Sequence, residues 1–121
     1  MFRILCRVTI AIGITSAASA MDSSVGKLTV TSVVDNLEQP WAFAVLPEGG
    51  VLITERDGVL LHVAGNKRAT VTGVPKVWAQ GQGGLLDITL PRNFATSSEV
   101  ILTYAKPQPQ GAETALAVAR L

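Results

Sequence analysis

Short strand-like segments recur along this chain at a spacing of about ten residues, and glycine, proline or asparagine stands between them. An alternating segment over 27–36 is followed by a meander of four predicted strands over 41–46, 51–55, 59–64 and 69–71. After a glycine-rich connection, three more follow at 85–90, 100–105 and 114–121. Helical periodicity is not apparent after residue 20. The pattern predicts an all-β fold, either a sandwich or successive blades of a propeller.

The first twenty residues have the organisation of an export signal. Arg3 and Arg7 give a positive start, Val8–Ile14 an apolar core, and Ala18–Ala20 a small-residue cleavage pattern. The apolar run is too short to span a bilayer as a helix. We therefore expect a signal peptide over 1–20, a mature chain that begins at Met21, and a periplasmic or secreted location.

Composition narrows the range of partners. Removal of Arg3 and Arg7 leaves eight basic residues against nine acidic ones, a net charge of −1, which gives no electrostatic reason to expect nucleic acid or an anionic membrane. The only cysteine, Cys6, lies in the predicted signal peptide, so disulfides and thiol chemistry are excluded from the mature chain. Residues 21–121 are enough for one small domain or part of a larger one.

The connection between the two groups of strands, Val74–Leu90, contains the leading candidate for a binding residue. In Gly81-Gln82-Gly83-Gly84, the only side chain able to reach outward is that of Gln82. Its amide offers a donor and an acceptor without charge, which suits a sugar hydroxyl or a quinone oxygen. The simpler interpretation is an ordinary glycine-rich turn between strands.

Two tryptophans and the single histidine are weaker candidates. Trp41 follows a proline at a strand start and is predicted to pack in the core, whereas Trp78, four residues before Gln82, is the better candidate for a cleft wall. His62 lies in mid-strand with no carboxylate or nucleophile in view, so it is predicted to face a neighbouring strand or solvent rather than act as a base.

The charged residues are assigned structural roles. The cluster of Glu55, Arg56 and Asp57 before Gly58 is interpreted as a solvated turn. Asp87 lies in an apolar strand and is predicted to accept backbone hydrogen bonds at a junction between blades. No metal-ligand spacing, phosphate-binding loop or serine nucleophile motif is present, which counts against hydrolase and nucleotide-binding functions.

Four blocks of sequence together resemble a known family. They are LEQPWAF at 37–43, LPEGGVLITERDG at 46–58, Val74-Pro75, and GQGGLLD at 81–87. In order and spacing they resemble the opening of the soluble PQQ-dependent aldose sugar dehydrogenases of the glucose/sorbosone dehydrogenase family. The resemblance covers nearly all of the chain after residue 20.

The resemblance implies a six-bladed β-propeller whose first two blades lie in 21–121, with pyrroloquinoline quinone (PQQ) and Ca²⁺ bound in a cleft. It implies oxidation of an aldose to a lactone, hydride transfer to the quinone and an external electron acceptor. Of the family's functional positions only the glutamine of the glycine block matches here, at Gln82, as a contact to sugar and cofactor. The catalytic histidine and the calcium ligands are expected beyond Leu121, so the chain alone would be inactive. The alternative is a secreted propeller that binds carbohydrate or protein without catalysis.

Overall fold

The computed structural model describes residues 19–121, which separate into one unit that ends at Val33 and a larger one over 34–121. The predicted signal peptide lies outside the described residues except for Ser19 and Ala20. In the first unit, β1 (Ser19–Ser23) pairs antiparallel with β2 (Gly26–Val30). The strand predicted over 27–36 therefore ends at Val30, and the expected cleavage after Ala20 falls inside β1.

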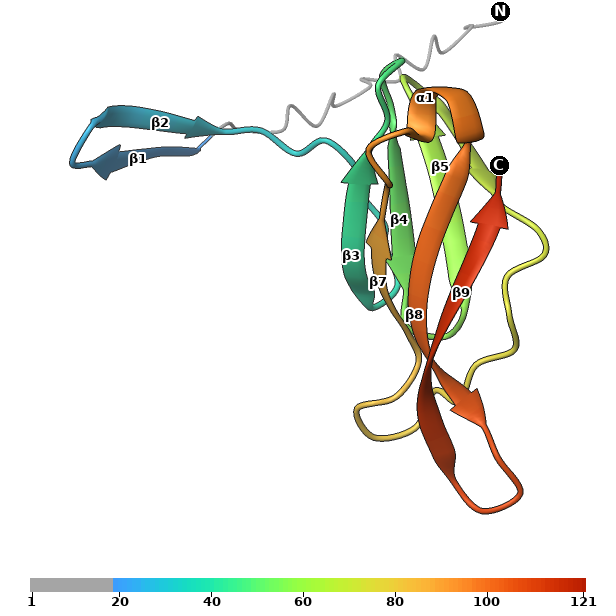
Figure 1. Ribbon diagram of the computed structural model, residues 1–121. Helices are drawn as coiled ribbons and strands as arrows, with labels where there is room; N and C mark the ends of the chain where they lie inside the picture. The colour runs from blue at the N-terminus through green and yellow to red at the C-terminus, as the bar shows by residue number, and fades with distance from the viewer. Residues whose placement is uncertain (1–18) are drawn as a thin grey trace, which may run out of the picture. The chain divides into compact units, whose positions relative to one another are not determined.

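The first sheet of the larger unit is a four-stranded antiparallel meander (Figure 1). Its strands, paired in chain order, are β3 (Pro40–Val45), β4 (Val51–Glu55), β5 (Val59–Ala64) and β6 (Lys67–Thr70). Between β3 and β4 the amide of Leu46 donates to the carbonyl oxygen of Gly50, and that of Gly49 donates back to Leu46. The meander of four strands predicted from sequence is confirmed.

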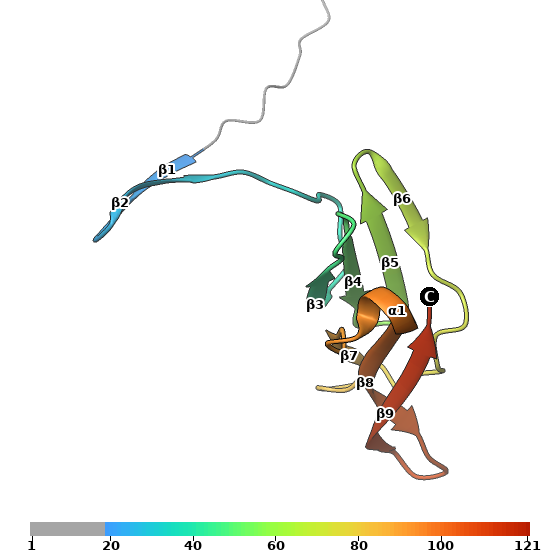
Figure 2. The ribbon, with the colours of Figure 1, turned by 45° about the horizontal axis from the view of Figure 1, so that its top comes forward.

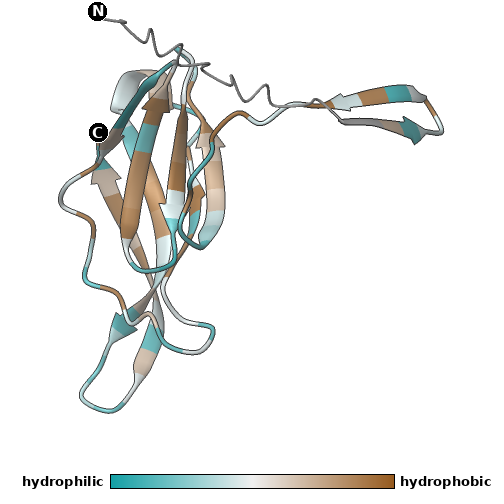
Figure 3. Ribbon diagram, turned by 180° about the vertical axis from the view of Figure 1, so that it is seen from behind, coloured by the Kyte–Doolittle hydropathy of each residue, from teal (hydrophilic) through white to brown (hydrophobic). Residues whose placement is uncertain are grey.

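The second sheet contains three antiparallel strands, β7 (Leu85–Thr89), β8 (Glu99–Pro107) and β9 (Ala112–Arg120), also in chain order. The β8–β9 hairpin is longer than predicted, because β8 continues to Pro107 and the connecting loop is only four residues, 108–111. Figure 3 shows that apolar residues concentrate in the strands and polar residues in the turns.

A one-turn helix, α1 (Phe94–Ser97), connects β7 to β8 where the sequence predicts only a turn. It is too short to show helical periodicity, and it is anchored by the buried ring of Phe94. The next residue, Ser98, adopts a left-handed conformation, and its carbonyl oxygen accepts a hydrogen bond from the amide of Leu121. Figure 2 shows α1 beside the end of the chain. Residues 19–121 include no helix long and apolar enough to span a bilayer.

The hydrophobic core lies between the inner faces of the two sheets, where β7 packs against β3 and β4. Its buried members are Leu46, Leu52, Leu60, Leu85, Ile88, Phe94, Val100 and Leu102. Burial of each such side chain contributes about 1.5–3 kcal/mol. This core fixes the β4–β5 turn next to the segment that leads into β7, and the candidate site is built there.

Candidate functional site

Gln82 lies in a β-turn formed by Gln80–Gly83, just before β7. The amide of Gly83 donates to the carbonyl oxygen of Gln80 at 2.8 Å, and Gly81 takes a φ of +55° that glycine adopts without strain. The Gln82 side chain is exposed, and within residues 19–121 it makes no hydrogen bond. Its amide is therefore available to a ligand.

The side chain of Arg56, in the β4–β5 turn, is the main support of this glycine loop. Its Nε donates to the carbonyl oxygen of Gly83 at 3.0 Å, and its Nη2 donates to those of Ala79 at 3.2 Å and Gly81 at 2.9 Å. The main chain adds a further bond, because the amide of Leu85 donates to the carbonyl oxygen of Arg56 at 2.9 Å. The interpretation of residues 55–57 as a solvated turn is wrong for Arg56.

Two glycines of the loop are required by close packing rather than by turn geometry alone. A Cβ at Gly84 would overlap the main-chain carbonyl of Arg56 and lie 2.6 Å from its Cγ. A Cβ at Gly83 would lie 2.5 Å from the carbonyl oxygen of Trp78. The loop can approach Arg56 because Gly84 lacks a side chain, and it can approach the carbonyl oxygen of Trp78 because Gly83 lacks one.

Glu55 and Thr54, which precede Arg56, are buried polar residues with hydrogen-bond partners. Glu55, only 5% exposed, accepts a hydrogen bond from the amide of Glu38 at 2.7 Å and lies 3.6 Å from Nη2 of Arg68. The Thr54 hydroxyl contacts Leu86 of β7. Glu55 is therefore also not part of a solvated turn, whereas Asp57 is exposed as predicted.

The two tryptophans differ from each other in environment. Trp78 is half-buried, and its amide donates to the carbonyl oxygen of Ala105 at 2.8 Å, which ties the start of the loop to β8. Trp41 is 49% exposed, so the predicted core position is wrong in the described residues. Its strand, β3, is an edge strand of the first sheet and also exposes Phe43 and Val45.

Asp87 is exposed on β7, not buried as its apolar neighbours suggested. Its Oδ1 accepts a hydrogen bond from the amide of Ile88 at 2.9 Å, so Asp87 does accept a backbone bond, but from the next residue of its own strand; the predicted role at a junction between blades stays a prediction. The pairing of β7 with β8 is irregular between Leu85 and Ile88, and this irregularity turns Asp87 outward.

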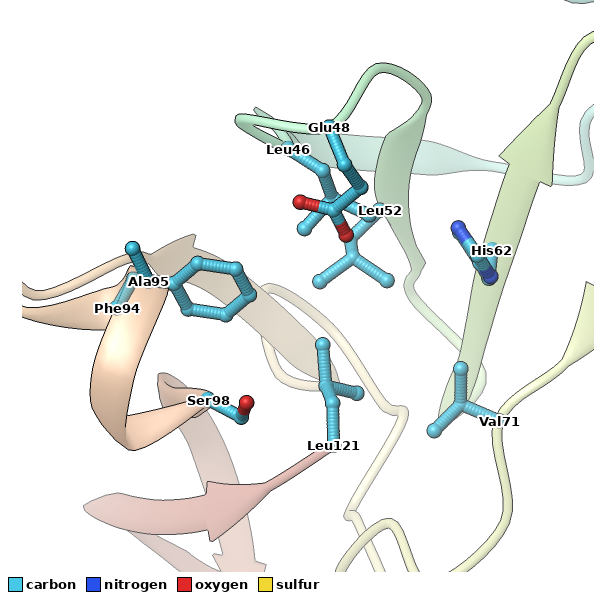
Figure 4. A pocket seen from close by; sticks show the side chains of 9 residues that line it. All are labelled: Leu46, Glu48, Leu52, His62, Val71, Phe94, Ala95, Ser98 and Leu121. Carbon is cyan, nitrogen blue, oxygen red and sulfur yellow. The ribbon is translucent and has the colours of Figure 1, made fainter.

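The side chain of His62 lines a cavity that does not include the Gln82 loop. His62 lies opposite Leu52 in the first sheet and lines a space of about 410 Å³ together with Glu48, Phe94 and Leu121 (Figure 4). These residues surround the β3–β4 turn and α1, at the end of β4 opposite the Arg56 turn. His62 and Gln82 therefore do not share a site. Among the residues described, no group of three His, Cys, Asp or Glu side chains could hold a metal ion.

Fold and site together define an all-β protein built from successive antiparallel sheets of the propeller type, with an amide presented on a glycine loop where two sheets meet. Sequence comparison then gives the family. The profile described as Glucose / Sorbosone dehydrogenase matches residues 37–121. The chain belongs to the glucose/sorbosone dehydrogenase family.

Individual relatives agree with this assignment. The aldose sugar dehydrogenase YliI of Escherichia coli K12 is 43% identical over 108 residues, which cover 86% of this chain and 29% of that protein. A solved glucose dehydrogenase superposes with a TM-score of 0.72 at 43% identity, over 75% of this chain and 30% of its own. The PQQ-bound aldose sugar dehydrogenase of Streptomyces coelicolor superposes with a TM-score of 0.66 at 25% identity, over 74% of this chain and 26% of its own. The chain thus spans less than a third of each of these relatives.

Proposed function

We propose that this chain is the N-terminal part of an exported, PQQ-dependent dehydrogenase that oxidises aldose sugars to lactones. The observation that carries the proposal is the family match over residues 37–121, together with an exposed Gln82 amide on a loop that is hydrogen-bonded to Arg56. A relative of 43% identity is an aldose sugar dehydrogenase, and a structural neighbour is PQQ-bound. In this proposal the protein is periplasmic or secreted after removal of residues 1–20.

The Gln82 amide fits the proposed ligands chemically. Its NH₂ group can donate to a sugar oxygen or a quinone carbonyl, and its oxygen can accept from a sugar hydroxyl, with no change in ionisation. PQQ, when bound, supplies the hydride acceptor. Gln82 orients the sugar and the cofactor but moves no proton, since a neutral amide is not a base.

The proton acceptor and the calcium ligands must come from residues other than those described. His62 is at the other end of the sheet, and residues 19–121 contain no metal-ligating cluster. Both groups would lie in the part of the protein that the relatives have beyond the matched region. An external electron acceptor completes the proposed cycle.

The test is to reconstitute the full-length protein with PQQ and Ca²⁺ and to follow dye reduction by glucose and other aldoses. Reduction that requires the cofactor supports the dehydrogenase. A folded protein that binds sugars but reduces no dye would favour the non-catalytic binding propeller instead. The variant Gln82→Ala should weaken sugar oxidation without unfolding the protein, and unchanged sugar affinity and turnover would remove Gln82 from the site.

A further inference from the structure

We infer that Arg56 is the positioning residue for Gln82: by binding three carbonyl oxygens of residues 79–83, its guanidinium group fixes the direction in which the Gln82 side chain leaves the main chain. The inference builds on the proposed function of Gln82. It assigns to Arg56 no contact with sugar or cofactor. Its physical basis is the set of hydrogen bonds around the loop.

Both peptide groups that flank Gln82 are fixed. The one before it is held because the carbonyl oxygen of Gly81 accepts from Nη2 of Arg56 at 2.9 Å. The one after it is held because the amide of Gly83 donates to the carbonyl oxygen of Gln80 at 2.8 Å. Two fixed peptide planes determine the Cα–Cβ direction of the residue between them. Flanking glycines would otherwise leave that direction free.

The geometry requires an arginine. The carbonyl oxygens of Ala79 and Gly81 share Nη2, and that of Gly83 binds Nε, so one planar group collects alternate carbonyls of the loop. A guanidinium group presents five donors in a fixed plane, whereas a lysine ammonium is a compact charge on a flexible stem. Hydrogen bonds from a charged donor are also roughly twice as strong as neutral ones.

Arg56 is itself bound by Gln39 through two hydrogen bonds. The Oε1 atom of Gln39 accepts from Nη1 of Arg56 at 2.7 Å, and its carbonyl oxygen accepts from the Arg56 amide at 3.0 Å. Gln39 takes a φ of +50°, a left-handed conformation that is unfavourable for a residue other than glycine and is placed directly before Pro40. Such strain persists only where surrounding contacts over-determine it. The contacts to Arg56 are of that kind.

The guanidinium group of Arg56 is surrounded by the negative ends of neutral dipoles. All four Nη1, Nη2 and Nε acceptors named above are neutral oxygens, three from the main chain and one from an amide. The positive charge is thus spread over dipoles of the loop that carries Gln82. Loss of the guanidinium group would leave the half-buried carbonyl groups of Ala79 and Gly83 without this partner.

The first experiment measures amide hydrogen exchange of residues 79–86 in the full-length protein, without sugar or cofactor, for the wild type and Arg56→Lys. We expect exchange at Gly83 and Leu85 to be about tenfold faster or more in Arg56→Lys, the effect of losing at least one charge-assisted hydrogen bond. The matched control is Arg68→Lys, since Arg68 also donates to main-chain oxygens, those of Asp35 and Asn36, and these partners and its ion-pair partner Glu55 all lie outside residues 79–86. It should leave exchange in 79–86 unchanged.

The second experiment is a double-mutant cycle with Gln82→Ala, measured as kcat and KM for an aldose in the reconstituted protein. If Arg56 acts through Gln82, Arg56→Lys should lower kcat/KM about tenfold to a hundredfold, and should lower it no further in the Gln82→Ala background. Fully additive losses would overturn the inference. So would unchanged exchange in 79–86.

The two levels of failure can be told apart. If Gln82→Ala has no effect on activity, the proposed role of Gln82 fails, whatever the exchange data show. If Gln82→Ala reduces activity but Arg56→Lys changes neither exchange nor kcat/KM, only the inference fails. Should Arg56→Lys not fold, Gln39→Ala removes just the acceptor of Nη1, and it must accelerate exchange in 79–86 if the inference holds.

Discussion

The hydroxyl group of Thr54 donates a hydrogen bond of 2.6 Å to the carbonyl oxygen of Leu86, and this bond joins β4 of the first sheet to β7 of the second. The same hydroxyl oxygen accepts from the amide of Ala42 at 3.0 Å, so one buried side chain connects three strands. The bond lies two residues from Gly84. One buried hydroxyl group therefore contributes to the contact between the two sheets.

Thr54→Val should destabilise the protein although it preserves side-chain shape. The valine would leave the Leu86 carbonyl and the Ala42 amide without this partner, and an unpaired buried polar group costs about 1–3 kcal/mol. We expect the free energy of unfolding of the full-length protein to fall by about 2 kcal/mol in urea denaturation. Thr89→Val, at an exposed position of β7, is the control and should stay within about 0.5 kcal/mol. Equal effects of the two variants would contradict the linking role of Thr54.

Gly84→Ala should destabilise the protein because the added Cβ would clash with Arg56, and not only because alanine disfavours the backbone conformation at this position. Gly84 and Gly111 both have positive φ, at 148° and 85°, but only a Cβ at Gly84 would meet Arg56. Overpacking of this kind typically costs about 1–3 kcal/mol. We therefore expect Gly84→Ala to lower the thermal midpoint clearly more than Gly111→Ala, in scans of the two variants side by side. A Gly111→Ala midpoint as low as that of Gly84→Ala would show that backbone conformation alone accounts for the loss.

The sequence predicts an element well where local turn residues set its bounds, and poorly where its structure depends on pairing or packing with other segments. β4 and β5 match the predicted bounds because glycine-containing turns stand at both ends of each strand. The one-turn helix α1 is missed because a single turn shows no period. The exposure of Asp87 is missed because it follows from an irregularity in strand pairing, which leaves no compositional trace.

Within the candidate site, the role of Gln82 can be predicted from sequence, whereas that of Arg56 cannot. A lone amide among glycines is visible in sequence because its neighbours lack side chains. The role of Arg56 is invisible, since its loop acceptors are carbonyl oxygens of residues 23 to 27 positions later and every residue has a carbonyl. Only the packing of the two sheets brings that turn and that loop together.

Leu52→Ala should be among the most destabilising single truncations of the first sheet. Leu52 is fully buried in the core between the sheets, and large-to-small substitutions of this kind cost about 2–5 kcal/mol. We expect a loss in that range in urea denaturation of the full-length protein. Val25→Ala, in the exposed turn between β1 and β2, is the control and should change stability by less than about 0.5 kcal/mol. A loss below about 1 kcal/mol for Leu52→Ala would mean that the core between the sheets is not closely packed.

His62→Gln should leave the proposed sugar oxidation unchanged even though His62 is the only histidine of the chain. The imidazole lines the cavity beside Glu48 and α1, whereas Gln82 lies beside the Arg56 turn, so we expect His62 to lie outside the proposed sugar site. We expect kcat within about twofold of the wild type and the same pH–rate profile, because a residue outside the site contributes no pKa to that profile. The measurement is dye reduction over a range of pH with the reconstituted full-length protein. A large fall in kcat with loss of one limb of the profile would make His62 the base, and would require the two ends of the sheet to meet in one site.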